Sequence, residues 1–408
     1  MHSPAFHIVS QEDRRWAHNE AMDQTASRNW QGARGHREDP PAMVDSSHAP
    51  NRRRPLPGWS ALLLSILLMI SALSACSTRP GSHSLHWSQL PPLPDTLGVA
   101  GPFAGVSGGA LLVAGGANFP GKMPWEGGQK VWHDAVYALN GINRPWKRVG
   151  TLPRPLAYGV SITTKRGMLC IGGSDADRHY REVFLLNFHQ GQLAVEPFPS
   201  LPLPLANAAG ALVGSTIYVT GGSDQPGEQS ALNQCFAMDL AAKPPAWSTL
   251  PPCPGKARIL PVAGAGERDF YLFGGAALEQ TNGRMARVYL HDAWRYQPEH
   301  GWQRLADLPK PCVAGPTPAP KVDASFLLVG GDDGSHIGFQ PPEKHPGFPK
   351  AVLVYDLKTG SWHTNGEVPA ARATVPTAFW HNHFVIPSGE MRPGVRSPEV
   401  WTFTSERL

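Results

Sequence analysis

Three charged side chains near the C-terminus have the types and the spacing that acid–base chemistry needs. They are Glu390, Arg392 and Arg396, in the turn-rich segment Ser388-Gly-Glu-Met-Arg-Pro-Gly-Val-Arg396. A positioned carboxylate can accept a proton and return it, and a planar guanidinium can hold a carboxylate through paired hydrogen bonds. The arginines of this segment therefore favour an anionic ligand. The alternative is a salt bridge from Glu390 to Arg392 or Arg396 that only fixes the loop.

Other loop charges are weaker candidates. Arg154, Arg258 and Arg372 fall in segments that we expect to open on the same face, where a basic funnel would favour an anion. The alternative is that most of these charges are only solvated. The pairs His133-Asp134 and His291-Asp292 recur at one place in two repeats. Because both pairs stand at the start of a strand, we interpret them as structural residues of the repeat, and no metal site is predicted.

The elements that carry these residues form an internal repeat. Apolar strands end in a Gly-Gly or Ser-Gly pair at intervals of 49 to 58 residues. Each pair is followed by an alternating strand and then, in most repeats, by a tryptophan before a proline turn. The six pairs begin at Gly115, Gly172, Gly221, Gly274, Gly330 and Ser388, and the third-strand aromatic residues are Trp146, Phe198, Trp247, Trp302 and Trp362.

This pattern resembles the kelch repeat over residues 85–408. The resemblance implies an all-β fold, a six-bladed kelch-type β-propeller. The ends of the chain fit the same plan, because Leu85–Leu90 is a tryptophan strand without a blade before it. The segment Pro398–Thr404 is a third strand without a following one. We expect the N- and C-terminal strands to close the last blade together, which leaves no sheet edge open.

The glutamate segment also resembles the Gly-Glu-x-x-Pro-Gly-x-Arg motif of the N-acetylneuraminate epimerase family, the bacterial sialic acid mutarotases. Two further stretches agree with this family, Gly101–Phe119 and Arg154–Ser161. The glutamate motif comes last here, whereas in the best-known members it precedes the Phe-Ala-Gly motif. The chain thus resembles the cyclically permuted branch, in which the sugar need not be the same.

The resemblance implies exchange of the α and β anomers of a cyclic sugar acid through its open-chain form. Glu390 matches the proton acceptor and Arg396 its catalytic partner, placed on the substrate carboxylate. Substrate-binding positions implied by the motifs are Asn118, Arg154, Tyr158 and Arg392. No metal or organic cofactor is needed for this reaction. The alternative function is a non-catalytic kelch module that binds a glycan or a protein at the cell surface.

The N-terminal part has a different character. Residues 1–54 form a polar leader in which Met43 is an alternative start of translation, and residues 55–75 read as a signal peptide. The run ends in Leu73-Ser-Ala-Cys76, which resembles a bacterial lipobox, so Cys76 is the expected lipidation site and residues 76–84 a tether. An uncleaved transmembrane helix is the alternative. The lipobox implies a periplasm-facing lipoprotein of the cell envelope, and Ser77 is compatible with the outer membrane.

Composition narrows the partners. The formal net charge of +4 is small for 408 residues and is not gathered into basic blocks apart from Arg52–Arg54, so nucleic acid is excluded as a predicted partner. Cys170 and Cys235 fall in strands and read as buried thiols. Cys253 and Cys312 lie in comparable loops of consecutive blades, and a disulfide between them is left open for an oxidising compartment.

Overall fold

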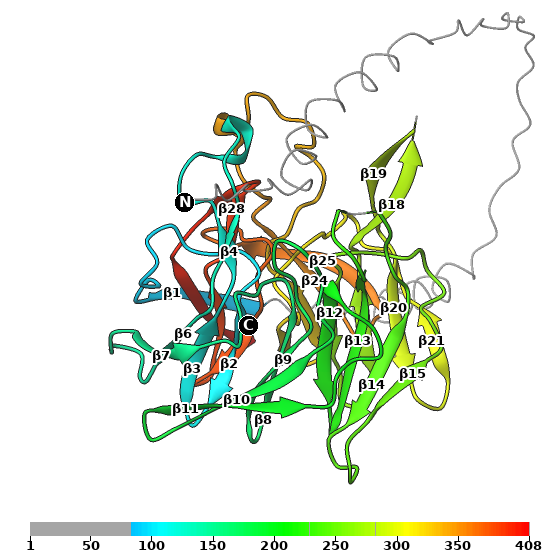
Figure 1. The fold of residues 1–408 in the computed structure, drawn as a ribbon. Helices are drawn as coiled ribbons and strands as arrows, with labels where there is room; N and C mark the ends of the chain where they lie inside the picture. Colours follow the sequence, from blue (N-terminus) through cyan, green and yellow to red (C-terminus); the bar gives the residue numbers. More distant parts are fainter. Residues whose placement is uncertain (1–82, 228, 282, 408) are drawn as a thin grey trace, which may run out of the picture.

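The fold is a ring of six four-stranded antiparallel sheets (Figure 1). The computed structural model describes residues 83–227, 229–281 and 283–407. The predicted all-β, six-bladed propeller is confirmed. The predicted leader, signal peptide and lipidated Cys76 lie outside the described residues. Within the described ranges, no helix is both long enough and apolar enough to cross a membrane.

Each blade consists of short apolar strands separated by glycine-containing turns, and its second strand is the most deeply buried. Blades 1 to 3 contain β2 (Phe103–Ser107), β3 (Ala110–Ala114), β6 (Ala135–Leu139) and β7 (Lys147–Thr151); β8 (Val160–Thr164), β9 (Gly167–Ile171), β10 (Val183–His189) and β11 (Gln192–Phe198); β12 (Ala206–Val213), β13 (Thr216–Ser223), β14 (Cys235–Asp239) and β15 (Trp247–Leu250). Blades 4 to 6 contain β16 (Val262–Ala265), β17 (Phe270–Phe273), β20 (Ala293–Gln297) and β21 (Gly301–Arg304); β22 (Lys321–Val322), β23 (Ser325–Leu328), β24 (Ala351–Asp356) and β25 (Ser361–Glu367); β26 (Ala378–Trp380), β27 (His383–Pro387), β30 (Val400–Arg407) and β1 (His83–Leu90).

The two ends of the chain close blade 6, as predicted. Strand β1 pairs antiparallel with β30, from His83 opposite Arg407 to Leu90 opposite Val400. The pairing begins two residues before the predicted first residue, Leu85. Because strands from both ends of the chain complete the last blade, the ring is closed.

The repeated tryptophans join neighbouring blades. Their indole N–H groups donate to backbone carbonyl oxygens in the segment before the same blade, at 2.8 Å in each case; the pairs are Trp146 with Pro91, Trp247 with Pro199, Trp302 with Pro251 and Trp362 with Ala306. A large aromatic body with one polar tip suits this position, because the ring packs in the core while the N–H is satisfied.

A closed ring of backbone hydrogen bonds forms a hub around the channel axis. In each blade, one residue of the segment leading into the first strand donates its N–H to the corresponding carbonyl of the preceding blade, at 2.7–2.9 Å; these hub residues are Gly101, Tyr158, Asn207, Leu260, Ala314 and Thr374. All six have φ between +54° and +61°. That region is costly for Leu260 and Thr374, so the surrounding blades must impose it.

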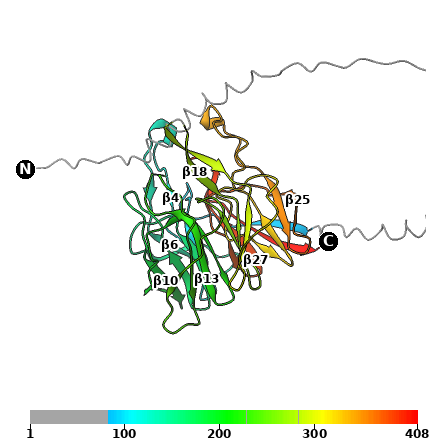
Figure 2. The same ribbon diagram turned by 90° about the vertical axis from the view of Figure 1, so that its right-hand side faces the viewer.

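Three small hairpins rise from the blades on one face of the ring, which we call the site face (Figures 1 and 2). They join the second and third strands of blades 1, 4 and 6, and they are β4 (Ala117–Asn118) with β5 (Val131–Trp132), β18 (Ala276–Thr281) with β19 (Arg284–Tyr289), and β28 (Glu390–Arg392) with β29 (Val395–Arg396). The same face carries the short 3-10 turns η3 (Pro124–Glu126) and η4 (Pro342–Lys344).

The disulfide that the sequence left open is not formed. Cys253 and Cys312 are both free and buried, and they pack in different cores, Cys253 beside Tyr218 and Phe270 and Cys312 beside Phe273. Burial raises the pKa of Cys253 to about 11 and that of Cys312 to about 12. The two loops are equivalent in the repeat, and for that reason they lie in separate blade interfaces.

Candidate active site

Glu390 and Arg396 face each other across the β28–β29 hairpin. They are partners in its register, and they form an ion pair in which Nη2 of Arg396 lies 3.1 Å from Oε1 of Glu390. The hairpin turns at Gly394, whose φ of +76° belongs to the left-handed region that glycine tolerates best. The Glu390 side chain is 16% exposed and that of Arg396 only 3%. The carboxylate is therefore the open member of the pair.

The Arg396 guanidinium is held from blade 1 as well. Its Nε donates to the Ala117 carbonyl at 3.3 Å, and its Cζ lies 4.6 Å from the ring centroid of Phe119. Its Nη1 is buried and has no hydrogen-bond partner among the described residues. A buried donor without a partner costs about 1–3 kcal/mol. This N–H is consequently suited to a ligand oxygen.

Ser388 fixes the base of the hairpin against blade 1. Its hydroxyl accepts the N–H of Val99 at 2.7 Å and lies 2.7 Å from the Ser397 carbonyl oxygen. The N–H of Gly389 donates to the Val99 carbonyl. Serine therefore replaces the first glycine of the usual pair because its hydroxyl joins the last blade to the first.

Asn118 lies in the neighbouring sector, as the order of the motifs predicted, but its amide is committed to the protein. Its Nδ2 donates to Oδ2 of Asp95 at 3.2 Å and to the Gly98 carbonyl at 2.9 Å. Its Oδ1 lies 2.8 Å from Nε2 of His133, and the residue is 1% exposed. This geometry suits a residue that positions the neighbouring Ala117 carbonyl, and the predicted contact of Asn118 with substrate stays a prediction.

Arg392 belongs to the same hairpin and reaches across the face to blade 5. Its Nη1 donates to the Glu343 carbonyl at 2.6 Å, and its Nε is buried without a partner among the described residues. The hairpin is thereby connected to the loop before β24. The structure brings Arg392 close to Glu390, and its predicted role toward substrate stays a prediction.

The structure does not place Arg154 in contact with the pair. Its Nη1 lies 3.1 Å from Oε1 of Glu182, and its guanidinium stacks on Tyr180 at 4.3 Å. These contacts hold it within blade 2 and the segment before it. A role for Arg154 toward the same ligand stays a prediction that no contact with Glu390 supports.

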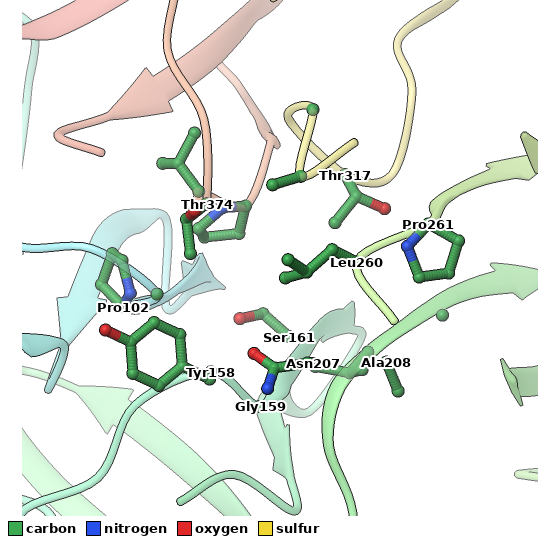
Figure 3. A pocket seen from close by; sticks show the side chains of 17 residues that line it. Pro102, Tyr158, Gly159, Ser161, Asn207, Ala208, Leu260, Pro261, Thr317 and Thr374 are labelled. Carbon is green, nitrogen blue, oxygen red and sulfur yellow. The ribbon is translucent and has the colours of Figure 1, made fainter. Parts of the chain in front are cut away.

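Tyr158 is a hub residue and lines a small cavity in the channel. Figure 3 shows Tyr158 and Ser161 from blade 2, Asn207 from blade 3 and Leu260 from blade 4 around this space. The cavity volume is about 50 Å³, which is far below the roughly 300 Å³ at which ligand pockets begin. Glu390 and Arg396 do not line it. This cavity is therefore too small for a sugar acid, and Glu390 lies outside it.

The expected basic funnel is smaller than the sequence suggested. Arg258 is 1% exposed and forms a two-pronged ion pair with Asp292, at 2.8 and 2.6 Å. Arg372 is 3% exposed and pairs with Glu399. Both carry acidic partners in the blade wall, so neither borders the mouth as an uncompensated charge.

Residues 73–195 and 198–339 match the sequence model described as N-acetylneuraminate epimerase. The chain belongs to the N-acetylneuraminate epimerase family. The matched residues end before Glu390, so the family assignment and the geometry of the glutamate hairpin are independent observations.

Individual relatives agree with the family. The chain is 45% identical over 127 residues to the N-acetylneuraminate epimerase of Brucella suis, covering 27% of this chain and 32% of that protein. It is 27% identical over 230 residues to that of Haemophilus influenzae, covering 50% and 58%. These matches therefore span about a third to just under three-fifths of the relatives' lengths.

A solved structure described as "Structure of YjhT" superposes with a TM-score of 0.57 at 15% sequence identity. The superposition covers 79% of this chain and all of that chain. At this level of identity the likeness concerns the fold, which is the same propeller architecture.

The sequence alone did not single out two neighbours of Arg396. Phe119 stacks on its guanidinium, and the Ala117 carbonyl accepts its Nε–H. Both lie in the stretch Ala114–Phe119 that carries part of the family resemblance. The contact across the first and last blades is what the sequence alone could not reveal.

Proposed function

We propose that this chain interconverts the α and β anomers of N-acetylneuraminate or a related sugar acid. The observation that carries this proposal is the partly open Glu390 carboxylate beside a buried arginine with one N–H left unpartnered. The family of the chain supports the same chemistry.

In the proposed reaction, Glu390 removes the proton of the anomeric hydroxyl while a water molecule gives a proton to the ring oxygen and the ring opens. Reclosure on the other face of the carbonyl reverses both transfers, so the proton returns from Glu390 to the new anomeric oxygen. Atoms and charge balance without a cofactor. Arg396 keeps the carboxylate oriented through its 3.1 Å contact.

We assign the sugar carboxylate to Nη1 of Arg396. A guanidinium that already holds Glu390 and the Ala117 carbonyl can give its remaining N–H to a second carboxylate. Because the side chain is only 3% exposed, the ligand reaches Nη1 only if a neighbouring side chain moves aside.

Proton NMR of anomer exchange tests the proposal. Freshly released α-anomer of N-acetylneuraminate is followed at a pH where spontaneous exchange is slow, with and without the protein. Faster exchange supports the proposal. Binding without faster exchange contradicts it and favours the non-catalytic kelch module.

We also propose that the chain is anchored by lipid at Cys76 in the bacterial envelope and faces the periplasm, with the outer membrane as its destination. The lipobox-like Leu73–Cys76 and the following Ser77 support this. Mass spectrometry of membrane-extracted protein should find an acylated N-terminal Cys76, and Cys76→Ala should leave the precursor unprocessed. A soluble, unmodified form beginning elsewhere would contradict it.

A further inference from the structure

The two ends of strand β1 lie at opposite faces of the propeller. Leu90 pairs with Val400, which follows the β28–β29 hairpin by four residues, and His83 pairs with Arg407. Leu90 is thus at the site face, and His83 is at the far face, where the turns within each blade lie. In Figure 2 the C-terminal end of β30, which pairs with the start of β1, is well separated from β4 and β18.

The chain therefore enters the propeller from the face opposite the site. Only six residues separate Cys76 from His83, and a fully extended chain spans at most about 3.3–3.6 Å per residue, or roughly 25 Å from the Cα of Cys76 to that of His83. The eight-residue strand β1 is itself roughly 23 Å long at about 3.3 Å per residue. If the tether ran fully extended along the outside of blade 6, Cys76 would reach only about as far as Leu90. It would not pass the hairpins that stand above it.

We infer that a lipid at Cys76 holds the propeller with its site face turned away from the membrane, so that the ligand reaches Glu390 from the aqueous compartment. This inference rests on the proposed anchor. It narrows the ligand class to soluble sugar acids, or sugar acids of another surface, and it excludes glycans whose lipid is seated in the same membrane leaflet.

The orientation can be measured with one fluorophore on each face. The four described cysteines are buried, so a cysteine introduced on the surface is the accessible thiol of the described chain. Lys358→Cys places it in the turn between β24 and β25 on the far face, and Lys122→Cys places it in the loop between β4 and β5 on the site face. Both lysines are exposed, and the substitution is the same at both positions.

Each labelled, full-length protein is extracted with its lipid and reconstituted into liposomes that carry an energy-transfer acceptor on their headgroups. Because the two faces are separated by roughly the length of an eight-residue strand, about 25 Å, transfer from Lys358→Cys should be at least about twofold more efficient than from Lys122→Cys. Equal transfer from both sites, or stronger transfer from Lys122→Cys, would overturn the orientation.

Two controls separate this inference from the proposals on which it depends. Mass spectrometry of each labelled protein reports whether Cys76 is acylated. An unacylated Cys76 overturns both the anchor and the orientation, whereas anomer exchange by Glu390 is measured independently. Insertion of a long Gly/Ser segment after Gly81 should remove the difference between the two labels; a difference that survives would show that something other than the short tether orients the protein, which contradicts our reasoning.

Discussion

Oε1 of Glu390 lies 3.1 Å from Nη2 of Arg396, and the two residues stand opposite each other in the β28–β29 register. The sequence left open whether this contact would merely fix the loop. The surroundings favour a further role, because Ser388 and the contact of Arg392 with Glu343 would hold the hairpin even without the Glu390–Arg396 ion pair. An unpartnered N–H on a buried guanidinium costs free energy, which a purely structural ion pair would not require.

Glu390→Gln should keep the fold and much of the ligand affinity, because the amide has nearly the same shape. It cannot take up the proton, so anomer exchange should slow by roughly a hundredfold or more. The matched control is Glu279→Gln, which makes the same change in the β18–β19 hairpin of the same face. Unchanged exchange with Glu390→Gln, measured by NMR, would show that another group moves the proton.

Arg396→Lys should weaken affinity for a sugar acid more than affinity for its neutral methyl ester. Lysine keeps the charge but loses the planar fork, and with it the Nε contact to Ala117 and the stack on Phe119. Binding is measured by calorimetry for both ligands. The control Arg304→Lys, on outer strand β21, should change neither affinity. If Arg396→Lys weakened binding of the acid and of the ester equally, Arg396 would not contact the ligand carboxylate.

Asp292→Asn should destabilise the protein by about 3–5 kcal/mol at pH 7, because it leaves the 1%-exposed Arg258 without its counter-charge. Burial alone would raise the pKa of Asp292, but the hydrogen bonds and charge of Arg258 lower it overall. A lowered pKa in the folded protein gives stability that is complete above the unfolded value of about 3.9 and is lost as pH falls through the folded value.

The difference in free energy of unfolding between the native protein and Asp292→Asn should therefore be constant from pH 7 to about 5 and shrink below about 4. Urea unfolding at each pH provides it. A difference that does not change down to low pH would mean that packing, and not the ion pair, accounts for the loss.

The cysteines should behave as separate buried thiols. Alkylation in denaturant without reductant should modify Cys253 and Cys312 fully, since they are not bonded to each other. In the native protein their reaction should be very slow, because burial raises both pKa values, to about 11 and about 12. Peptide mass spectrometry that finds these two residues joined would contradict the structure.

Local signals were sufficient for the blades and their closure. Gly-Gly pairs, tryptophans and orphan strands at the two ends depend on neighbouring residues or on simple alternation, and each appears in the structure where the repeat predicted it. The glutamate segment was singled out by its resemblance to a family motif, in which Glu390 and Arg396 lie six residues apart in one loop.

Contacts between residues far apart in the chain could not be predicted from the sequence. Asn118 was assigned to the ligand because its motif resembles a family motif, yet Asp95 and His133 occupy its amide. In the sequence Arg258 resembles a solvated loop charge, whereas in the structure it pairs with Asp292, 34 residues later. The left-handed conformation of Leu260 and Thr374 opposes their local preference, so only the assembled ring explains it.

The hub also fixes how many blades this chain can have. Each blade gives one N–H to the blade before it and one carbonyl to the blade after it, all in the same rotational sense. The series ends where it began only when the sixth member, Thr374, meets Gly101 at 2.7 Å. Removing or duplicating one repeat would leave a donor and an acceptor facing a gap or a clash at the axis, so blade number in this protein should change only together with the conformation of every hub residue.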